Sequence, residues 1–356
     1  MASSEVLLGG GGLVLNVTIP PMSLALLLFV LPPYLFFKLL LSAAQHVFSE
    51  DVAGKVILIT GASSGIGEHL AYEYARRGGC LALVARRENR LRDVANTAVC
   101  FGSPDVLAIT ADVSKVEDCK HCVDVTVNHF GRLDHLVNNA GIVPVCLFEE
   151  TTDVTNLAPA MDVNFWGSVY GTYFAIPHLK RSGGRIVAIT SSAGWLRAPR
   201  LSMYGATKAA AIAFYETLKV EIGREVGITI VTPGMIESEI SQGKFLSKEG
   251  QVVLDLELRD LEVSITPIMP VKEAAKSIVD SACRGENCLT VPAWVWQSFY
   301  WKVYFPEMLE WCNRTLLISK VGNDERDTLS KKLLYLTGLK QHLYPEMVRD
   351  PHVKEQ

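Results

Sequence analysis

The chain has 356 residues, a formal net charge of −4 at pH 7 and a hydrophobic content of 49%. This length suits one large α/β domain with extensions, and the slightly acidic balance argues against a nucleic-acid partner. The eight cysteines are scattered, and the Cys119/Cys122 pair has no second pair that would complete a zinc site. We therefore expect free thiols in a reducing compartment and no bound metal.

Residues 1–48 are predicted to form a hydrophobic membrane anchor. Residues 13–44 carry a single charge, Lys38, and about 20 apolar residues suffice to span a bilayer. Proline pairs at positions 20–21 and 32–33 interrupt this segment. Because proline removes a backbone donor and blocks helix continuation, each remaining arm is too short to cross. We expect a bent, monotopic hairpin, with a kinked single span as the alternative.

A strand, a glycine-rich turn and a helix are predicted at residues 56–77. Residues 56–60 are apolar and mostly β-branched, the turn reads TGASSGIG, and the helical pattern stops at Gly78 and Gly79. Such a turn places a pyrophosphate at the helix N-terminus. The sequence therefore predicts a dinucleotide site. The expected contacts in this turn are Gly61, Ser63, Ser64, Gly65, Ile66 and Gly67.

The end of the second predicted strand, residues 81–85, indicates which dinucleotide binds. Enzymes of this layout that use NAD usually carry an acid here for the ribose 2′-hydroxyl. This chain has Arg86 and Arg87 instead, and two guanidinium groups favour a 2′-phosphate. We expect NADP rather than NAD, with Arg86 as a contact. Alternatively, both arginines only begin the next helix as solvated charges.

Ser191, Tyr204 and Lys208 have the spacing of a proton-transfer site. Tyr204 and Lys208 are four residues apart, which puts them on one face of a helix. A nearby ammonium lowers the phenol pKa from about 10 toward the range that acid–base catalysis needs. Ser191 follows an apolar strand signal and precedes Tyr204 by thirteen residues. With the glycine turn, these residues predict hydride transfer to or from a nicotinamide.

The C-terminal third contains three further features. Residues 235–270 interrupt the strand–helix alternation, and we expect them to form a substrate lid. Residues 293–356 are a predicted C-terminal extension, and its stretch 294–311 is rich in aromatic side chains. Such residues favour membrane interfaces, so this stretch predicts either a second membrane contact or a packing surface such as a homodimer interface. Beyond Gly322 the chain is polar and charged, and we expect a peripheral tail.

Strand signals that alternate with helical stretches predict the fold. The class is α/β: a Rossmann-like, doubly wound parallel sheet in a single domain, residues 49–292, between the N-terminal anchor and the C-terminal extension. The predicted strands are residues 56–60, 81–85, 106–110, 135–138, 185–190, 229–232 and 288–291.

Residues from about 50 to 290 resemble a short-chain dehydrogenase/reductase. The matching pieces are residues 60–67, 111–113, 138–141, 163–164, 191, 204–208 and 233–234, with Ser238 where the family often has Thr. The resemblance implies that Ser191 orients the substrate oxygen, that Tyr204 is the acid/base and that Asn164 holds a water in a proton relay. It also implies that Lys208 lowers the tyrosine pKa and binds the nicotinamide ribose. Further implied cofactor contacts are Asp112, Val113, Asn138, Ala140, Tyr204, Lys208, Pro233 and Gly234.

The proline-containing anchor, residues 31–38 in particular, is similar to that of the plant steroleosins, an oil-body group related to 11β-hydroxysteroid dehydrogenases. This implies an NADP-dependent enzyme that interconverts a hydroxyl and a ketone on a lipophilic substrate such as a steroid or sterol. It also implies residence on lipid droplets and the endoplasmic reticulum membrane, with the catalytic domain facing the cytosol. The alternatives are a lipid-droplet coat or sterol-sensing protein with a scaffold-only dinucleotide domain, and a reductase of another lipid carbonyl.

Overall fold

The computed structural model describes residues 3–47, 49–319 and 326–349. The chain divides into two compact units, Met1–Ser49 and Glu50–Gln356, each of which is described by itself. All eight cysteines are free thiols.

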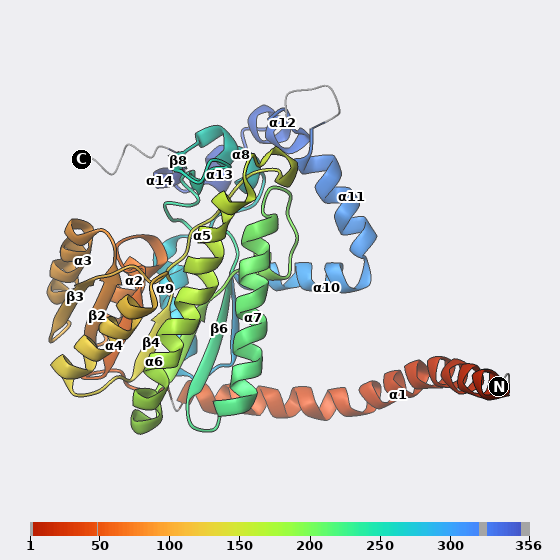
Figure 1. The fold of residues 1–356 in the computed structure, drawn as a ribbon, viewed down its shortest axis with the longest axis horizontal. Coiled ribbons are helices and arrows are strands. Elements are labelled where there is room, and N and C mark those ends of the chain that lie inside the picture. Colours follow the sequence, from red (N-terminus) through yellow and green to blue (C-terminus); the bar gives the residue numbers. More distant parts are fainter. Residues whose placement is uncertain (1–2, 48, 320–325, 350–356) are drawn as a thin grey trace. The chain divides into compact units, whose positions relative to one another are not determined.

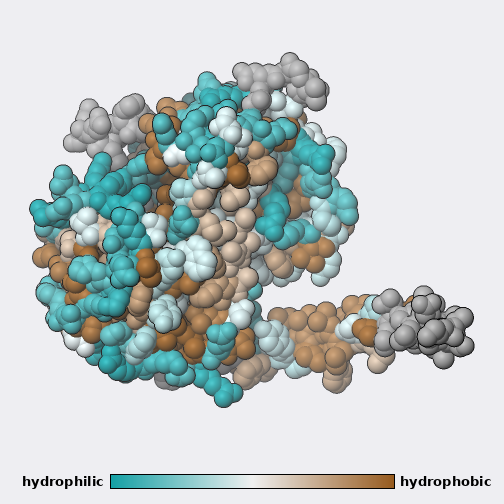
Figure 2. Space-filling model, in the orientation of Figure 1, coloured by the Kyte–Doolittle hydropathy of each residue, from teal (hydrophilic) through white to brown (hydrophobic). Residues whose placement is uncertain are grey.

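The first unit is one long helix, α1 (Ser3–Val47), with both proline pairs inside it. The helix curves but does not fold back, so the expected hairpin is wrong (Figure 1). Proline removes one donor and its ring crowds the carbonyl four residues earlier, which bends a helix, but the remaining backbone hydrogen bonds can carry the helix through it. Within it, residues Val17–Leu40 form a 24-residue apolar stretch long enough to cross a membrane. Figure 2 shows the mostly hydrophobic surface of this helix.

The second unit is built on a seven-stranded parallel sheet with the order β3-β2-β1-β4-β5-β6-β9. The order reverses between β1 and β4, as in a doubly wound fold. The seven predicted strands are confirmed, with ends that differ by at most two residues. They are β1 (Val56–Thr60), β2 (Cys80–Ala85), β3 (Val106–Thr110), β4 (His135–Asn138), β5 (Arg185–Ile189), β6 (Gly227–Pro233) and β9 (Cys288–Val291).

Helices cover both faces of the sheet (Figure 1). In β1, Ile57 and Ile59 pack toward the first layer, whereas Val56 and Leu58 pack toward the second. This alternation explains why the strands read as continuous apolar runs. The first layer is α2 (Gly65–Arg76), α3 (Glu88–Cys100) and α9 (Val271–Cys283). The second layer is α4 (Val116–Phe130), α6 (Gly167–Ser182) and α7 (Ser202–Ile222).

The segment predicted as a lid contains a small hairpin and a helix. The hairpin strands are β7 (Lys244–Leu246) and β8 (Val252–Leu254), and the helix is α8 (Leu256–Val263). Leu246 N donates to Val143 O at 2.8 Å, which attaches the hairpin to the segment after β4. The remaining helices are α5 (Ala158–Met161), α10 (Gln297–Tyr304), α11 (Pro306–Leu317), α12 (Leu329–Leu336), α13 (Lys340–Leu343) and α14 (Glu346–Arg349).

The C-terminal tail packs against α8, so the expectation of a peripheral tail is wrong for residues 326–349. Leu334, Tyr344 and Val348 are buried in a cluster with Val263. Arg259 Nη1 donates to Val348 O at 2.7 Å, and Arg259 itself is only 2% exposed. Only some of the tail's apolar side chains take part in this packing, because Leu329 and Leu336 are 45% and 85% exposed.

Candidate active site

A cavity of about 620 Å³ opens at the carboxyl ends of the parallel strands. The turns after β1 to β6 line it together with parts of the lid and of residues 294–317. Ligands of open parallel sheets bind at this edge, beside the point where the strand order reverses. Every residue predicted for the site lines this cavity except Gly67, Asn138 and Asn164.

The glycine-rich turn is clamped against the segment after β4. Gly61 has a φ of +66°, and a Cβ there would lie 2.7 Å from Ala140 Cα. A Cβ on Gly67 would collide with the side-chain nitrogen of Asn139, which donates to Thr60 O at 2.9 Å. Gly67 therefore lets the turn pack closely against Asn139, although Gly67 itself does not line the cavity. Residues 61 and 63–66 face the cavity at the start of α2, where backbone N–H groups can bind a phosphate.

The two arginines after β2 have different surroundings. Arg86 is exposed and lines the cavity. Arg87 is half-buried and donates to Ser63 Oγ at 3.1 Å, to Ser64 Oγ at 2.7 Å and to Glu239 Oε1 at 2.7 Å. Burial alone would raise the pKa of Glu239. The hydrogen bonds and positive charges of Arg87 and Lys244 outweigh the effect of burial and lower the pKa to about 2. Arg87 is thus a candidate anion contact besides Arg86, and it is not a solvated charge.

Of the predicted residues near the ends of β3 and β4, some line the cavity and others hold neighbouring elements in place. Asp112 and Val113 line the cavity. Asn138 does not, because its side chain is 2% exposed and its Nδ2 donates to the Tyr215 hydroxyl at 2.8 Å. Side chains alternate along a strand, so Asn138 points into the α6 and α7 layer while Asn139 meets the glycine turn. We interpret Asn138 as support for the site rather than a cofactor contact.

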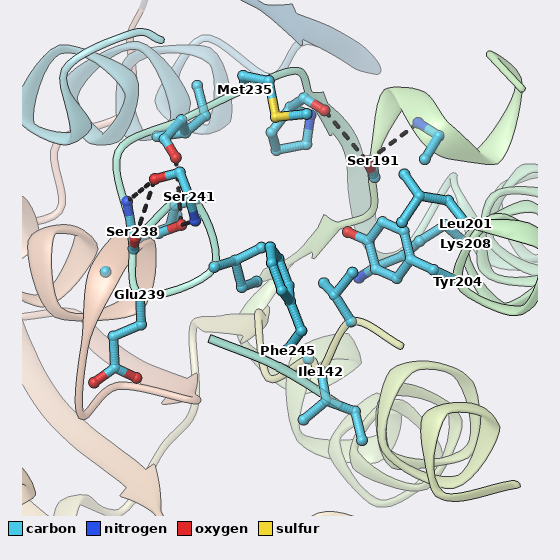
Figure 3. Close-up of a pocket in the computed structure, with 18 of the residues that line it drawn as sticks. Ile142, Ser191, Leu201, Tyr204, Lys208, Met235, Ser238, Glu239, Ser241 and Phe245 are labelled. Atoms are coloured by element: carbon cyan, nitrogen blue, oxygen red, sulfur yellow. Dashed lines mark hydrogen bonds between the residues drawn. The ribbon is translucent and has the colours of Figure 1, made fainter. Parts of the chain in front are cut away.

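Ser191, Tyr204 and Lys208 meet at one wall of the cavity (Figure 3). Ser191 lies just beyond β5, whereas Tyr204 and Lys208 lie one turn apart near the start of α7. Ser191 Oγ accepts from Ala193 N at 3.1 Å and donates to Pro233 O at 3.5 Å, and the Ser191 hydroxyl acts to lower the pKa of the Tyr204 phenol. Ser192 lines the cavity too.

Burial shifts both ionisable groups toward their neutral forms. It raises the pKa of Tyr204, and the hydrogen bond with Ser191 opposes this. It lowers the pKa of Lys208 to about 8, and Lys208 Nζ donates to Ile189 O at 3.1 Å. The expected lowering of the tyrosine pKa by Lys208 is wrong for the chain alone. The ammonium is 5.8 Å from the centre of the ring, and at that distance the loss of hydration dominates.

Asn164 lies behind the cavity in a π-helical turn, η3 (Asp162–Trp166). Its Oδ1 accepts from Ile142 N at 2.8 Å, and its Nδ2 donates to Ile142 O at 2.9 Å and to Thr207 Oγ1 at 3.0 Å. The side chain therefore ties the segment after β4 to α7, next to Lys208. Both amide hydrogens are engaged, whereas Oδ1 keeps one lone pair that can accept from a water. π-turns of this kind are frequent at functional sites.

The remainder of the cavity is mostly apolar, with a few polar groups from the lid. Glu239 and Glu262 are acidic lining residues that the sequence analysis missed. The contacts of Glu239 with Arg87 and of Glu262 with Arg200 join residues that are distant in the chain, so local patterns do not indicate them. The apolar walls include Ile142, Val143, Leu201, Phe245, Leu246, Val295, Leu316 and Leu317.

Comparisons with known proteins agree with this geometry. Residues 55–249 match the sequence profile of a family described as short chain dehydrogenase. The chain is 55% identical over 340 residues to 11-beta-hydroxysteroid dehydrogenase A of Sesamum indicum, a match covering 96% of this chain and 97% of the relative. It is 51% identical, with the same coverage, to 11-beta-hydroxysteroid dehydrogenase 1A of Arabidopsis thaliana.

Two solved structures show the same fold. An alcohol dehydrogenase from the archaeon Thermococcus sibiricus, complexed with 5-hydroxy-NADP, is 27% identical with a TM-score of 0.56, covering 67% of this chain and 94% of that one. A short chain dehydrogenase/reductase from Burkholderia phymatum, in complex with NAD, is 23% identical with a TM-score of 0.64, covering 72% and 96%.

Proposed function

Because the chain belongs to the short-chain dehydrogenase family, we propose that it is an NADP-dependent oxidoreductase that interconverts a hydroxyl and a ketone on a steroid or sterol. The observation that carries the proposal is the meeting of Ser191, Tyr204 and Lys208 at the wall of an otherwise apolar cavity. The names of relatives at 51–55% identity across nearly the whole chain support the steroid class.

The cavity residues fit a dinucleotide. The clamped glycine turn presents the start of α2 to a pyrophosphate, and no carboxylate ends β2. Arg86 and Arg87, with the hydroxyls of Ser63 and Ser64, favour a 2′-phosphate and hence NADP over NAD. When bound, NADP would supply or accept the hydride. The other proposed contacts are Asp112, Val113, Ala140, Pro233 and Gly234.

Tyr204 exchanges the proton in this mechanism. In alcohol oxidation the substrate carbon gives up a hydride and the hydroxyl proton passes to the phenolate oxygen, and in ketone reduction the phenol returns that proton. Ser191 donates a hydrogen bond to the same substrate oxygen. With the cofactor bound, Lys208 binds ribose hydroxyls and its ammonium favours the phenolate, while Asn164 holds a water that links Lys208 to solvent.

We place the enzyme on the endoplasmic reticulum membrane and the lipid-droplet surface, with the catalytic unit facing the cytosol. The apolar stretch Val17–Leu40 supports an anchor, since its side chains are exposed throughout. A second support is the exposed aromatic surface of α10 and α11, where Trp301, Tyr304 and Trp311 are 49–70% exposed. Leu317 of α11 also lines the cavity, so a lipophilic substrate could enter from the lipid side.

The test is turnover by the purified full-length chain in mild detergent. Hydroxysteroids, sterols and fatty alcohols are assayed with NADP and with NAD, and we expect a steroid to be oxidised with NADP preferred. Tyr204→Phe should lose at least about 100-fold in kcat yet bind NADPH normally, because it lacks only the proton-carrying oxygen. The matched control Tyr173→Phe alters a tyrosine that is 71% exposed and should keep full activity. Cofactor binding without turnover of any alcohol would favour the scaffold alternative.

A further inference from the structure

A carboxyl group that the proton-transfer mechanism does not use lies in the cavity wall. Glu262, in the last turn of α8, lines the cavity with a side chain only 8% exposed. Its charged neighbour is Arg200, whose Nη1 is 3.8 Å from Glu262 Oε1, which is too far for a hydrogen bond. Burial raises the pKa of Glu262 to about 8 against the opposing charge of Arg200. Near neutral pH the protonated carboxyl therefore offers a donor as well as an acceptor.

A second polar group in the cavity wall is the hydroxyl of Ser264, two residues further along the chain. Ser264 lines the cavity and is 3% exposed, and its Oγ has no hydrogen-bond partner in the part of the chain that the structure describes. Ser264 and Arg200 have φ values of 52° and 63°, which are unusual for residues other than glycine. Such backbone strain is unfavourable and clusters at functional sites. Both residues beside Glu262 are thus held in costly conformations.

The Ser264 hydroxyl is costly to bury without a partner, and the Glu262 carboxyl is too far from Arg200 for a hydrogen bond. A ligand in the cavity can provide a hydrogen-bond partner for both groups. Resting on the proposed function, we propose that Glu262 and Ser264 form a polar subsite for a second, uncharged oxygen of the substrate. This oxygen is a hydroxyl or carbonyl carried by the same lipophilic skeleton as the reacting one. The enzyme accordingly selects doubly oxygenated steroids over analogues that carry only the reacting oxygen.

The experiment compares a matched pair of steroids with the full-length chain. One has a second hydroxyl on a ring remote from the reacting carbon, and the other lacks it. Wild type should favour the first by at least about tenfold in kcat/KM, the range expected when a buried polar group gains or loses its partner. Glu262→Leu should lower this preference about 10- to 100-fold. Glu262→Gln keeps a donor and an acceptor and should retain most of it.

Glu257→Gln is the matched control, because this carboxylate lies on the same helix but pairs with Arg326 outside the cavity lining. It should leave the preference unchanged. Equal preferences in wild type and Glu262→Leu would overturn the subsite. If Glu262→Leu does not fold, as judged by its unfolding curve and NADPH binding, Ser264→Ala replaces it. That variant should lower the preference severalfold, and no change would overturn the proposal.

Equilibrium binding of both steroids in the presence of NADPH separates this inference from the proposed function. If neither steroid is turned over, the proposed reaction fails. A binding preference for the doubly oxygenated steroid that Glu262→Leu removes would still support the subsite. Equal binding of the pair by wild type, or binding of neither, would overturn it.

Discussion

Arg87 Nη1 lies 2.7 Å from Glu239 Oε1, which joins the turn after β2 to the segment after β6 across 152 residues of chain. Lys244 Nζ approaches the other oxygen of Glu239 at 3.1 Å, and Ser64 Oγ donates to that oxygen at the same distance. Glu239 thus contacts both Arg87, which is proposed to bind a 2′-phosphate, and Ser64 of the glycine turn. A phosphate that binds Arg87 must therefore compete with Glu239.

We expect Glu239→Gln to tighten NADP binding relative to NAD, because it removes a negative charge that competes for Arg87. The gain should be about 3- to 10-fold, since both side chains are partly exposed and solvent screens their charges. Titration of both cofactors into the full chain, followed by tryptophan fluorescence, measures it. Weaker NADP binding would instead mean that Glu239 orients Arg87 for the phosphate.

Arg87→Met and Arg86→Met form a matched pair that locates the phosphate contact. Arg87 is held by two hydroxyls and a carboxylate, whereas Arg86 is exposed. A pre-oriented guanidinium binds phosphate better, so Arg87→Met should weaken NADP at least about tenfold and Arg86→Met less. NAD affinity should hardly change in either variant. The reverse ranking in the same titration would restore Arg86 as the main contact.

Ser191→Ala should cost more activity than Ser192→Ala. Ser191 lines the same cavity wall as Tyr204 and acts on the pKa of its phenol, and its loss removes the proposed donor for the reacting oxygen. Loss of one such donor typically costs about 100- to 1,000-fold in kcat. Steady-state kinetics of both variants with the best substrate decide the matter. Equal losses would show that the two serines share the role.

Lys208 predicts a pH dependence of stability in the chain without cofactor. Below about pH 8 the lysine is protonated in both states, and burying its charge costs a constant amount. Between about pH 8 and 10.5 the folded lysine releases its proton while the unfolded one keeps it, so the free energy of unfolding rises. Lys208→Met should remove this rise, which is at most about 3 kcal/mol. Urea unfolding of both chains across this range measures it, and parallel profiles would contradict it.

Deletion of residues 1–48 should release a folded catalytic unit from membranes. The deletion keeps Glu50, whose backbone N donates to Cys283 O at 2.8 Å and whose carboxylate lies 3.3 Å from His135 Nε2. Flotation with lipid vesicles and thermal unfolding test release and folding. If the shortened chain still floats, Trp301→Ser with Tyr304→Ser tests whether the aromatic surface of α10 and α11 is sufficient to bind lipid.

Local patterns were sufficient to predict the sheet and the proton-transfer residues. A strand buried on both faces must be apolar at every position, so residues 56–60 and 185–189 were evident from composition alone. The glycine turn was also evident from the sequence, because only glycine fits at positions 61 and 67, where the backbone meets Ala140 and Asn139. The spacing of Tyr204 and Lys208 follows from the pitch of one helix.

Only the tertiary structure decided which residues meet from distant parts of the chain. No nearby residue indicates that Glu239 reaches Arg87, that Glu262 approaches Arg200, or that the C-terminal tail packs on α8. The two proline pairs suggested a hairpin, yet α1 continues through them because removal of a donor does not by itself reverse a helix. Likewise, whether Asn138 or Asn139 faces the glycine turn depends on the strand's orientation in the sheet, and so on contacts made by the whole fold.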